Sequence, residues 1–258
     1  MPTALVTGAT AGIGAAFAVH LATQGYDLVL VARGTDRLQE RRATLLTLGA
    51  PTVELITADL THAADREEVA ERLARPGAPV DLLVNNAGIG LGKEFLESTP
   101  DDLQRQIDLN VTAVVRLTHA VLPGMVQRGH GGVINVASIA GLVAGRGTTY
   151  AGSKAFVVSL SEGLSMSLRG TGVRVQALCP GFVRTEFHDR AGIDMTKTPD
   201  ALYVDIDLVV RTSLDDLRHD RPLSIPGPLY KVIATLSRLA PRGLVRSVAA
   251  KVNNKGRT

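Results

Sequence analysis

The chain has 258 residues, a length that fits one large domain or two small ones. Hydrophobic residues make up 45% of the sequence and charged residues 21%, which is typical of a globular protein with a sizeable core and excludes wholesale disorder. Aromatic residues, at 3% with no Trp, are too scarce for a protein that binds single-stranded nucleic acid by stacking bases, and we expect no nucleic-acid partner.

The cysteine content and the hydropathy of the sequence indicate the cellular compartment of the protein. The single cysteine, Cys179, excludes an internal disulfide framework and a cysteine-rich metal site. The six histidines, His188 among them, lack metal-ligand spacing, so we expect each to be a surface or capping residue and expect no metal. We find no apolar run near the ~18 residues that a membrane span needs, and no signal-peptide pattern at the N-terminus. We therefore expect a soluble, cytoplasmic protein.

The predicted strands and helices alternate along the chain. Apolar runs predict strands over residues 3–7, 26–32, 52–57, 80–84, 133–137 and 173–178. Helical periodicity is found over residues 13–21, 36–48, 63–73, 101–127, 151–168 and 205–218. This alternation predicts the α/β class: a doubly wound parallel sheet with helices on both faces, in one domain over residues 1–258. A polar segment over residues 186–222 interrupts the rhythm, and we interpret it as a substrate-loop insertion.

The C-terminus is basic. The last 28 residues contain seven Lys or Arg and no Asp or Glu, so the net charge of +3 conceals an acidic remainder. Leu229, Val232, Ile233 and Leu236 recur at helical spacing, which predicts a helical extension over residues 228–258. Two interpretations stay open: the apolar face docks on the domain, or the basic charges attract an anionic surface, either by weak contact with a membrane or through the phosphates of an acyl-CoA substrate.

A glycine-rich turn follows the first strand. Gly8, Gly12 and Gly14 stand where the predicted strand passes into a helix, with Thr10, Ala11 and Ile13 between them. Glycines let a backbone approach a pyrophosphate closely, and the helix N-terminus offers free N–H groups. The spacing differs from the common G-x-G-x-x-G pattern, but its position predicts a dinucleotide site in a Rossmann-type fold.

The end of the second strand indicates which dinucleotide binds. This position commonly carries an acid for the ribose of NAD or a base for the phosphate of NADP. Here Arg33 follows the strand, Arg37 lies one helical turn on, and Asp36 stands too far into the helix. NADP(H) is therefore favoured over NAD(H), with Arg33 contacting the 2′-phosphate. The alternative is that Arg33 is a solvated strand-end charge.

Tyr150 and Lys154 form the candidate catalytic pair. They are four residues apart at the start of a predicted helix, so they share one face. Lowering a phenol pKa by 2–3 units from about 10 requires roughly 3–4 kcal/mol, and an ammonium group ~4 Å away supplies about that much. Lys154 can thus make Tyr150 a general acid and base. Taken alone, the pair would more simply be a helix-surface contact, but Ser138 and Asn85–Gly88 end neighbouring strands at the same crevice.

With these motifs together, the chain resembles the short-chain dehydrogenase/reductase family over residues 3 to 185. The motifs are the glycine turn, Ala58-Asp59-Leu60, Asn85 to Gly88, Asn110, Ser138, Tyr150 with Lys154, and Pro180-Gly181 followed by Thr185. The resemblance implies that Asp59 holds the adenine, that Asn110 positions a water relay to Lys154, and that Ser138 polarises the substrate carbonyl. It also implies that Thr185 contacts the nicotinamide. Further cofactor contacts are expected from Leu60, Asn86, Ala87, Gly88, Pro180, Gly181 and Val183.

The expected function is NADP(H)-dependent interconversion of a carbonyl and a secondary alcohol. The sequence around Leu223–Pro228 resembles the branch of long-chain 3-oxoacyl-CoA reductases and hydroxysteroid dehydrogenases. Six apolar or aromatic residues follow the sixth strand, and two interpretations of them stay open: they line an apolar substrate pocket, or they belong to a loop that covers the core. They are Phe182, Phe187, Ile193, Met195, Leu202 and Tyr203. The resemblance suggests a homo-dimer or homo-tetramer. Rival functions are a non-catalytic NADP-binding regulator and a peripheral membrane protein.

Overall fold

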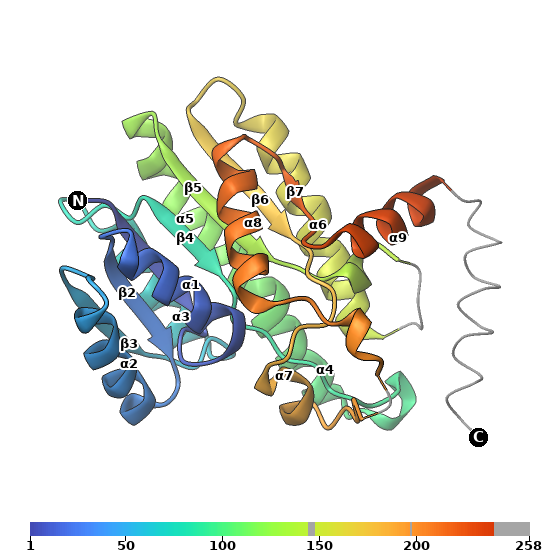
Figure 1. Ribbon diagram of the computed structural model, residues 1–258. Helices are drawn as coiled ribbons and strands as arrows, with labels where there is room; N and C mark the ends of the chain where they lie inside the picture. Colours follow the sequence, from blue (N-terminus) through green and yellow to red (C-terminus); the bar gives the residue numbers. More distant parts are fainter. Residues whose placement is uncertain (144–147, 197, 240–258) are drawn as a thin grey trace.

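The strands form one parallel sheet. The computed structural model describes residues 1–143, 148–196 and 198–239 (Figure 1). Within these residues the sheet order is β3-β2-β1-β4-β5-β6-β7. The strands are β1 Thr3–Thr7, β2 Asp27–Ala32, β3 Val53–Thr57, β4 Leu82–Asn85, β5 Gly131–Val136, β6 Val173–Leu178 and β7 Leu223–Ser224. The six predicted strands are confirmed to within two residues at each end, and so is the doubly wound fold class.

Helices cover both faces of the sheet. On one face lie α1 Gly12–Thr23, α2 Thr35–Thr47 and α8 Ile206–Arg218. On the other lie α3 Ala63–Ala74, α5 Ala113–Arg128 and α6 Thr149–Ser167. Alternate residues of each strand point to opposite faces, so Leu28 and Leu30 of β2 join the first core and Val29 and Val31 join the second.

The long helix between β4 and β5 is interrupted. The sequence predicts a continuous helix over residues 101–127, but the structure has α4 Pro100–Ile107, a π-helical turn over Asp108–Thr112, and α5. The stretch Pro100–Arg128 is also long and apolar enough to cross a membrane, which the search for apolar runs missed. Leu117, Val121 and Met125 of this stretch are buried against the sheet, as in a core helix of a globular domain.

The predicted insertion over residues 186–222 divides into two parts. Its first part holds α7 Glu186–Arg190 and a short turn over Asp200–Leu202, and only residues of this part lie on the cavity described below. Its second part, α8, packs against α1 with Val209 and Val210 fully buried. The interpretation of α8 as substrate loop is therefore wrong, because its apolar stripe completes the core on that face of the sheet.

Helix α9, Pro228–Leu239, packs on the domain through a different face of the helix from the one that its apolar spacing predicts. Tyr230 and Ala234 are its buried residues, whereas Leu229, Val232 and Leu236 are 43%, 55% and 60% exposed. The Tyr230 ring packs against Gly181, and its hydroxyl donates a hydrogen bond to the Leu202 carbonyl at 2.7 Å. The remainder of the predicted basic extension, residues 240–258, lies outside the described residues.

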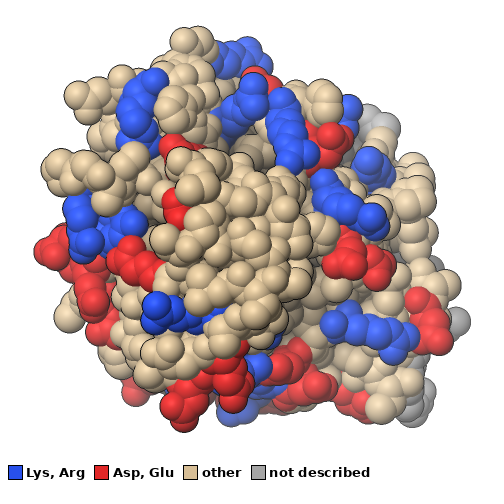
Figure 2. Space-filling model, turned by 60° about the vertical axis from the view of Figure 1, so that its left-hand side comes forward, with Lys and Arg blue, Asp and Glu red and all other residues tan. Residues whose placement is uncertain are grey.

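The chain connectivity places a crevice in the middle of the sheet. The strand order reverses between β1 and β4, so their following loops lead to opposite faces. Ligands of doubly wound sheets bind at this point, beyond the carboxyl ends of the strands. On the face of the molecule seen in Figure 2, basic and acidic side chains are interspersed around uncharged surface, with no continuous patch of one sign.

Candidate active site

The predicted site residues line one cavity of about 1550 Å³ at the carboxyl edge of the sheet. From the first loops it receives Gly8, Thr10, Ala11, Gly12, Ile13, Arg33, Arg37, Asp59 and Leu60. From the later loops it receives Asn86, Ala87, Gly88, Ser138, Tyr150, Lys154, Pro180, Gly181, Val183 and Thr185. Gly14 and Asn110 do not line the cavity, and both shape it from the layer of residues behind its lining.

The glycine turn is a cradle that side chains would fill. Gly8 and Gly12 have φ angles of 65° and 52°, in the left-handed region that favours glycine. A Cβ on Gly14 would lie 2.3 Å from Asn86 Nδ2 and 2.4 Å from the Gly8 carbonyl oxygen. The turn and the N-terminus of α1 therefore present bare backbone to the cavity, which fits the pyrophosphate of a dinucleotide.

Asn86 fastens the glycine turn to the end of β4. Its Nδ2 donates to the carbonyl oxygens of Thr7 and Gly8 at 2.9 and 3.3 Å. In return, the backbone N–H groups of Asn86 and Ala87 donate to Thr7 Oγ1 at 2.9 and 3.0 Å. Asn86 thus orders the two loops at the reversal of strand order, a contact that the sequence motif alone did not reveal.

Two arginines and an aspartate mark the end of the cavity beside β2 and β3. Arg33 is exposed, and Arg37 donates to Glu186 of α7 at 2.8 Å and to the Thr10 carbonyl at 3.3 Å. Burial works to raise the pKa of Asp59, but hydrogen bonds from Thr61 and the charge of Arg33 bring that pKa below its usual value. Arg33 and Asp59 are therefore close neighbours, as the expected adenosine phosphate site requires.

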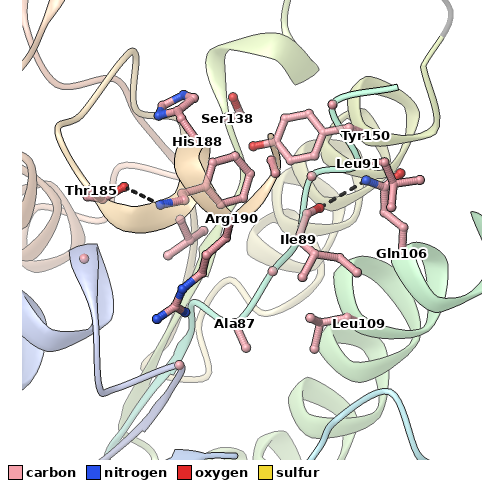
Figure 3. Close-up of a pocket in the computed structure, with 18 of the residues that line it drawn as sticks. Ala87, Ile89, Leu91, Gln106, Leu109, Ser138, Tyr150, Thr185, His188 and Arg190 are labelled. Carbon is pink, nitrogen blue, oxygen red and sulfur yellow. Dashed lines mark hydrogen bonds between the residues drawn. The ribbon is translucent and has the colours of Figure 1, made fainter. Parts of the chain in front are cut away.

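Tyr150 and Lys154 lie in the first turns of α6. The Thr148 hydroxyl oxygen caps this helix by accepting from the Ala151 N–H at 3.2 Å. Lys154 is buried, and its Nζ donates to the Val136 carbonyl of β5 at 2.8 Å. The Nζ lies 5.8 Å from the centre of the Tyr150 ring. In Figure 3 the Tyr150 hydroxyl is directed toward Ser138, with which its side chain forms a hydrogen bond.

Close packing brings Ser138 next to this pair. Ser138 follows β5 and starts a 3-10 turn over Ile139–Gly141, whose Ala140 N–H donates to Ser138 Oγ at 3.1 Å. A Cβ on Gly141 would lie 2.6 Å from the backbone of Lys154. Glycine at this position therefore lets the turn approach α6 closely enough for Ser138 and Tyr150 to meet.

Burial governs the acidity of the catalytic pair. It raises the pKa of Tyr150 to about 12, although the hydrogen bond with Ser138 acts in the opposite direction. Burial likewise lowers the pKa of Lys154 to about 8. Desolvation is the largest cause for both groups, so the net pKa of Tyr150 lies above its usual value, and the expected lowering of that pKa by Lys154 stays a prediction.

Asn110 holds the loop in front of Lys154. It lies in the π-helical turn and is fully buried. Its side chain accepts from the Ile89 N–H and donates to the Ile89 carbonyl, both at 2.9 Å. A Cβ on Gly88 would lie 3.2 Å from Asn110 Oδ1 and 3.4 Å from Lys154 Nζ, so the two groups face each other across Gly88. The side chain of Asn110 thus orders the Gly88–Ile89 loop, and the proposed water relay remains a prediction.

The loop after β6 closes the other side of the cavity. The Thr185 hydroxyl oxygen caps α7 by accepting from the Phe187 N–H at 3.3 Å (Figure 3). A Cβ on Gly12 would lie 3.1 Å from the Thr185 side chain, so this loop touches the glycine turn. At Gly181 a Cβ would meet the Tyr230 ring at 2.0 Å. Glycine is therefore needed here for the docking of α9.

Sequence reasoning missed several lining residues. Phe182, Phe187, Ile193 and Met195 line the cavity as one interpretation expected, whereas Leu202 and Tyr203 do not. His188 was expected at the surface, but it lines the cavity, and burial lowers its pKa. Further lining residues carry no recognisable sequence signal: Ile89, Leu91, Phe95, Gln106, Leu109 and Arg190. Among the described residues there is no cluster of three or more His, Cys, Asp or Glu that would hold a metal ion.

Comparison with known proteins agrees with this geometry. Residues 2–195 match the short chain dehydrogenase family model. The NADP-dependent 3-hydroxy acid dehydrogenase YdfG of Escherichia coli is 40% identical over 187 residues, which are 71% of this chain and 73% of that protein. The sulfoacetaldehyde reductase of Chromohalobacter salexigens is 39% identical over 202 residues, 77% of this chain and 79% of the relative.

A solved structure extends the similarity to almost the whole chain. The short-chain dehydrogenase from Sphingobium yanoikuyae in complex with NADPH has 37% sequence identity and a TM-score of 0.83, covering 99% of this chain and 94% of that one. These relatives do not confirm the branch of long-chain 3-oxoacyl-CoA reductases and hydroxysteroid dehydrogenases. They do establish the family, and the chain belongs to the short-chain dehydrogenases, which are NAD(P)-dependent oxidoreductases.

Proposed function

We propose that this chain is an NADP(H)-dependent oxidoreductase that interconverts a carbonyl group and a secondary alcohol. The observation that carries the proposal is the single cavity in which Ser138, Tyr150 and Lys154 face the glycine turn and Arg33. One part of the cavity fits a dinucleotide, and the other offers a proton donor beside a hydrogen-bonding hydroxyl group.

NADP(H) suits the charges at the edge of the cavity. Arg33 lies beside Asp59 where an adenosine ribose is expected, and the exposed arginine matches a 2′-phosphate. Support also comes from relatives, since the Escherichia coli protein is named as NADP-dependent and the Sphingobium structure contains NADPH. Gly8, Gly12 and Gly14 would hold the pyrophosphate, and the loop before Thr185 would contact the nicotinamide.

The chain's own residues provide the proton chemistry. When bound, NADPH supplies the hydride for the carbonyl carbon. Tyr150 keeps its proton at neutral pH because burial raises its pKa to about 12, so it can donate that proton to the substrate oxygen. Ser138 donates a hydrogen bond to the same oxygen. Lys154 carries its charge below about pH 8 and stabilises the phenolate that remains.

The substrate side of the cavity favours an apolar carbonyl compound. Leu91, Phe187, Ile193 and Met195 line the cavity, and the ring centre of Phe187 lies 5.7 Å from that of Tyr150. One relative is named a 3-hydroxy acid dehydrogenase and another a sulfoacetaldehyde reductase, and Lys93 and Arg105 also line the cavity, so 3-hydroxy acids are the second candidate class. An apolar or lipid-like ketone remains the first, because an aromatic ring, that of Phe187, packs on the ring of the proton donor.

A turnover screen tests the proposal. Purified protein is mixed with NADPH and a panel of aliphatic, aryl and 3-oxoacyl ketones, and separately with NADP⁺ and 3-hydroxy acids. The loss of NADPH in the first assay and its formation in the second are followed optically. Turnover of apolar ketones above that of 3-hydroxy acids supports the proposal. Binding of NADPH without turnover of any compound would instead favour a non-catalytic regulator.

A further inference from the structure

Glu186 joins the cofactor side of the cavity to the substrate side. It is the first residue of α7 and lies 149 positions beyond Arg37 in the sequence. Its Oε1 accepts from Arg37 Nη2 at 2.8 Å and its Oε2 accepts from Arg37 Nη1 at 3.2 Å. Glu186 Oε2 also accepts from Arg190 Nη2 on α7. One carboxylate thus holds two arginines that both line the cavity.

The Arg37 contact has the geometry that a phosphate would use. A guanidinium binds carboxylate and phosphate alike through two parallel N–H groups. Glu186 occupies both terminal nitrogens of Arg37, and Nη2 additionally donates to the Thr10 carbonyl of the glycine turn at 3.3 Å. The hydrogen bond from Arg37 is the largest cause that holds the Glu186 pKa below its usual value. Both N–H groups of Nη2 and one of Nη1 are therefore engaged, so the edge of Arg37 that pairs with Glu186 is not free for a two-pronged contact with a cofactor phosphate.

We propose that Glu186 is a specificity residue for the cofactor, an internal carboxylate that competes with the 2′-phosphate of NADP(H) for Arg37. This inference rests on the proposed use of NADP(H). A 2′-phosphate beside Arg33 displaces Glu186 from Arg37. NADH has no such phosphate and leaves the Arg37–Glu186 pair in place.

Helix α7 links the Arg37–Glu186 pair to the substrate side of the cavity. Phe187, next to Glu186, packs against Tyr150, and its ring also meets His188 edge-on at 5.4 Å between centres. Arg190 extends from α7 along the cavity toward Ala87 (Figure 3). Release of Glu186 from Arg37 therefore removes one of the contacts that hold the helix carrying these residues.

Fragment binding isolates the 2′-phosphate. Adenosine 2′,5′-bisphosphate and 5′-AMP are titrated calorimetrically into the full chain and into Glu186→Gln, which keeps the size of the side chain and removes its charge. Exposed ion pairs contribute up to about fivefold in an equilibrium constant. We expect Glu186→Gln to bind the bisphosphate about fivefold more tightly and 5′-AMP within about twofold of the wild type. Asp189→Asn, which removes a carboxylate from the same helix, is the matched control and should change neither affinity.

The outcomes separate this inference from the proposed function. The role of Glu186 would be overturned if Glu186→Gln bound the bisphosphate no more tightly than the wild type does. It would also be overturned if Glu186→Gln gained equal affinity for both fragments, or if Asp189→Asn gained as much affinity for the bisphosphate as Glu186→Gln. A wild-type chain that binds 5′-AMP as tightly as the bisphosphate would instead contradict the NADP(H) assignment, whatever the variant does.

Discussion

The cofactor side and the substrate side of the cavity are built in different ways. On the cofactor side, backbone geometry dominates: left-handed Gly8 and Gly12 form the turn, and Gly14 leaves room for it. On the substrate side, side chains from distant segments hold the loops, as when Tyr230 of α9 fixes Leu202 and Phe182. The first side depends on short local sequence, and the second on contacts over long separations.

The most severe test of this contrast is Gly14→Ala. Its Cβ would lie 2.4 Å from the Gly8 carbonyl oxygen, so the turn must distort. We expect a loss of about 1–3 kcal/mol in unfolding free energy, the usual cost of overpacking, and at least a tenfold weaker NADPH affinity. Calorimetric titration and denaturant unfolding measure both. Gly163→Ala is the control, because nothing lies within 4 Å of its added Cβ. That variant should gain about 0.5–1 kcal/mol, and an equal loss in both would refute the contrast.

Arg33→Asp tests cofactor choice at the edge of the same side. A hydrogen bond to a charged group contributes about 1.5–3 kcal/mol, so NADPH affinity should fall roughly 10- to 100-fold. NADH affinity should change much less, since it lacks the phosphate. Fluorescence titration of both cofactors measures the ratio. Arg42→Asp removes an arginine of α2 that does not line the cavity and should leave both affinities unchanged. A wild type that prefers NADH would refute the assignment.

Lys154→Met probes the buried base behind Tyr150. The Lys154 pKa falls from 10.5 to about 8 on folding, which corresponds to about 3 kcal/mol of destabilisation from the buried charge. Replacing Lys154 by Met removes this penalty but also removes the hydrogen bond to Val136, which costs about 1 kcal/mol. The penalty is complete below pH 8, where folded and unfolded lysine are both charged, and disappears as pH rises toward 10.5. Lys154→Met should thus be more stable by about 1–2 kcal/mol at pH 7, with a smaller difference at pH 10. Denaturant titrations at both pH values decide this, and a gain that grows with pH would contradict it.

Tyr230→Phe addresses the substrate side. Removing the hydroxyl leaves the Leu202 carbonyl and the Phe182 N–H without this partner, which costs about 1–2 kcal/mol. We expect faster hydrogen exchange at Phe182 and in residues 200–204 and a higher KM for the carbonyl substrate, with NADPH affinity nearly unchanged. Tyr203→Phe in the same segment is the control. An equal weakening of NADPH binding would show that the two sides are not separable.

The same contrast explains what the sequence could predict. The strands, most helices and the cavity-lining motif residues were predicted, because apolar periodicity and glycines act locally. Three features could not be predicted, because each depends on which loops meet in space. They are the hydrogen bonds of Asn86 to Thr7, the contacts of Asn110 with Ile89, and the position of His188 on the cavity. For α9, periodicity selected the wrong face, since the Tyr230 ring packs against Gly181 and its hydroxyl reaches Leu202 and Phe182, contacts that helical spacing does not reveal.

Tyr150→Phe tests the central claim most directly, namely that proton transfer from Tyr150 completes carbonyl reduction in this cavity. The substitution removes the hydroxyl that faces Ser138 and retains the ring that packs on Phe187. Turnover of a substrate found in the screen should fall by on the order of 10² or more, as expected when a general acid is lost. NADPH should still bind with nearly wild-type affinity. Near-normal turnover in Tyr150→Phe with NADPH bound would contradict the account.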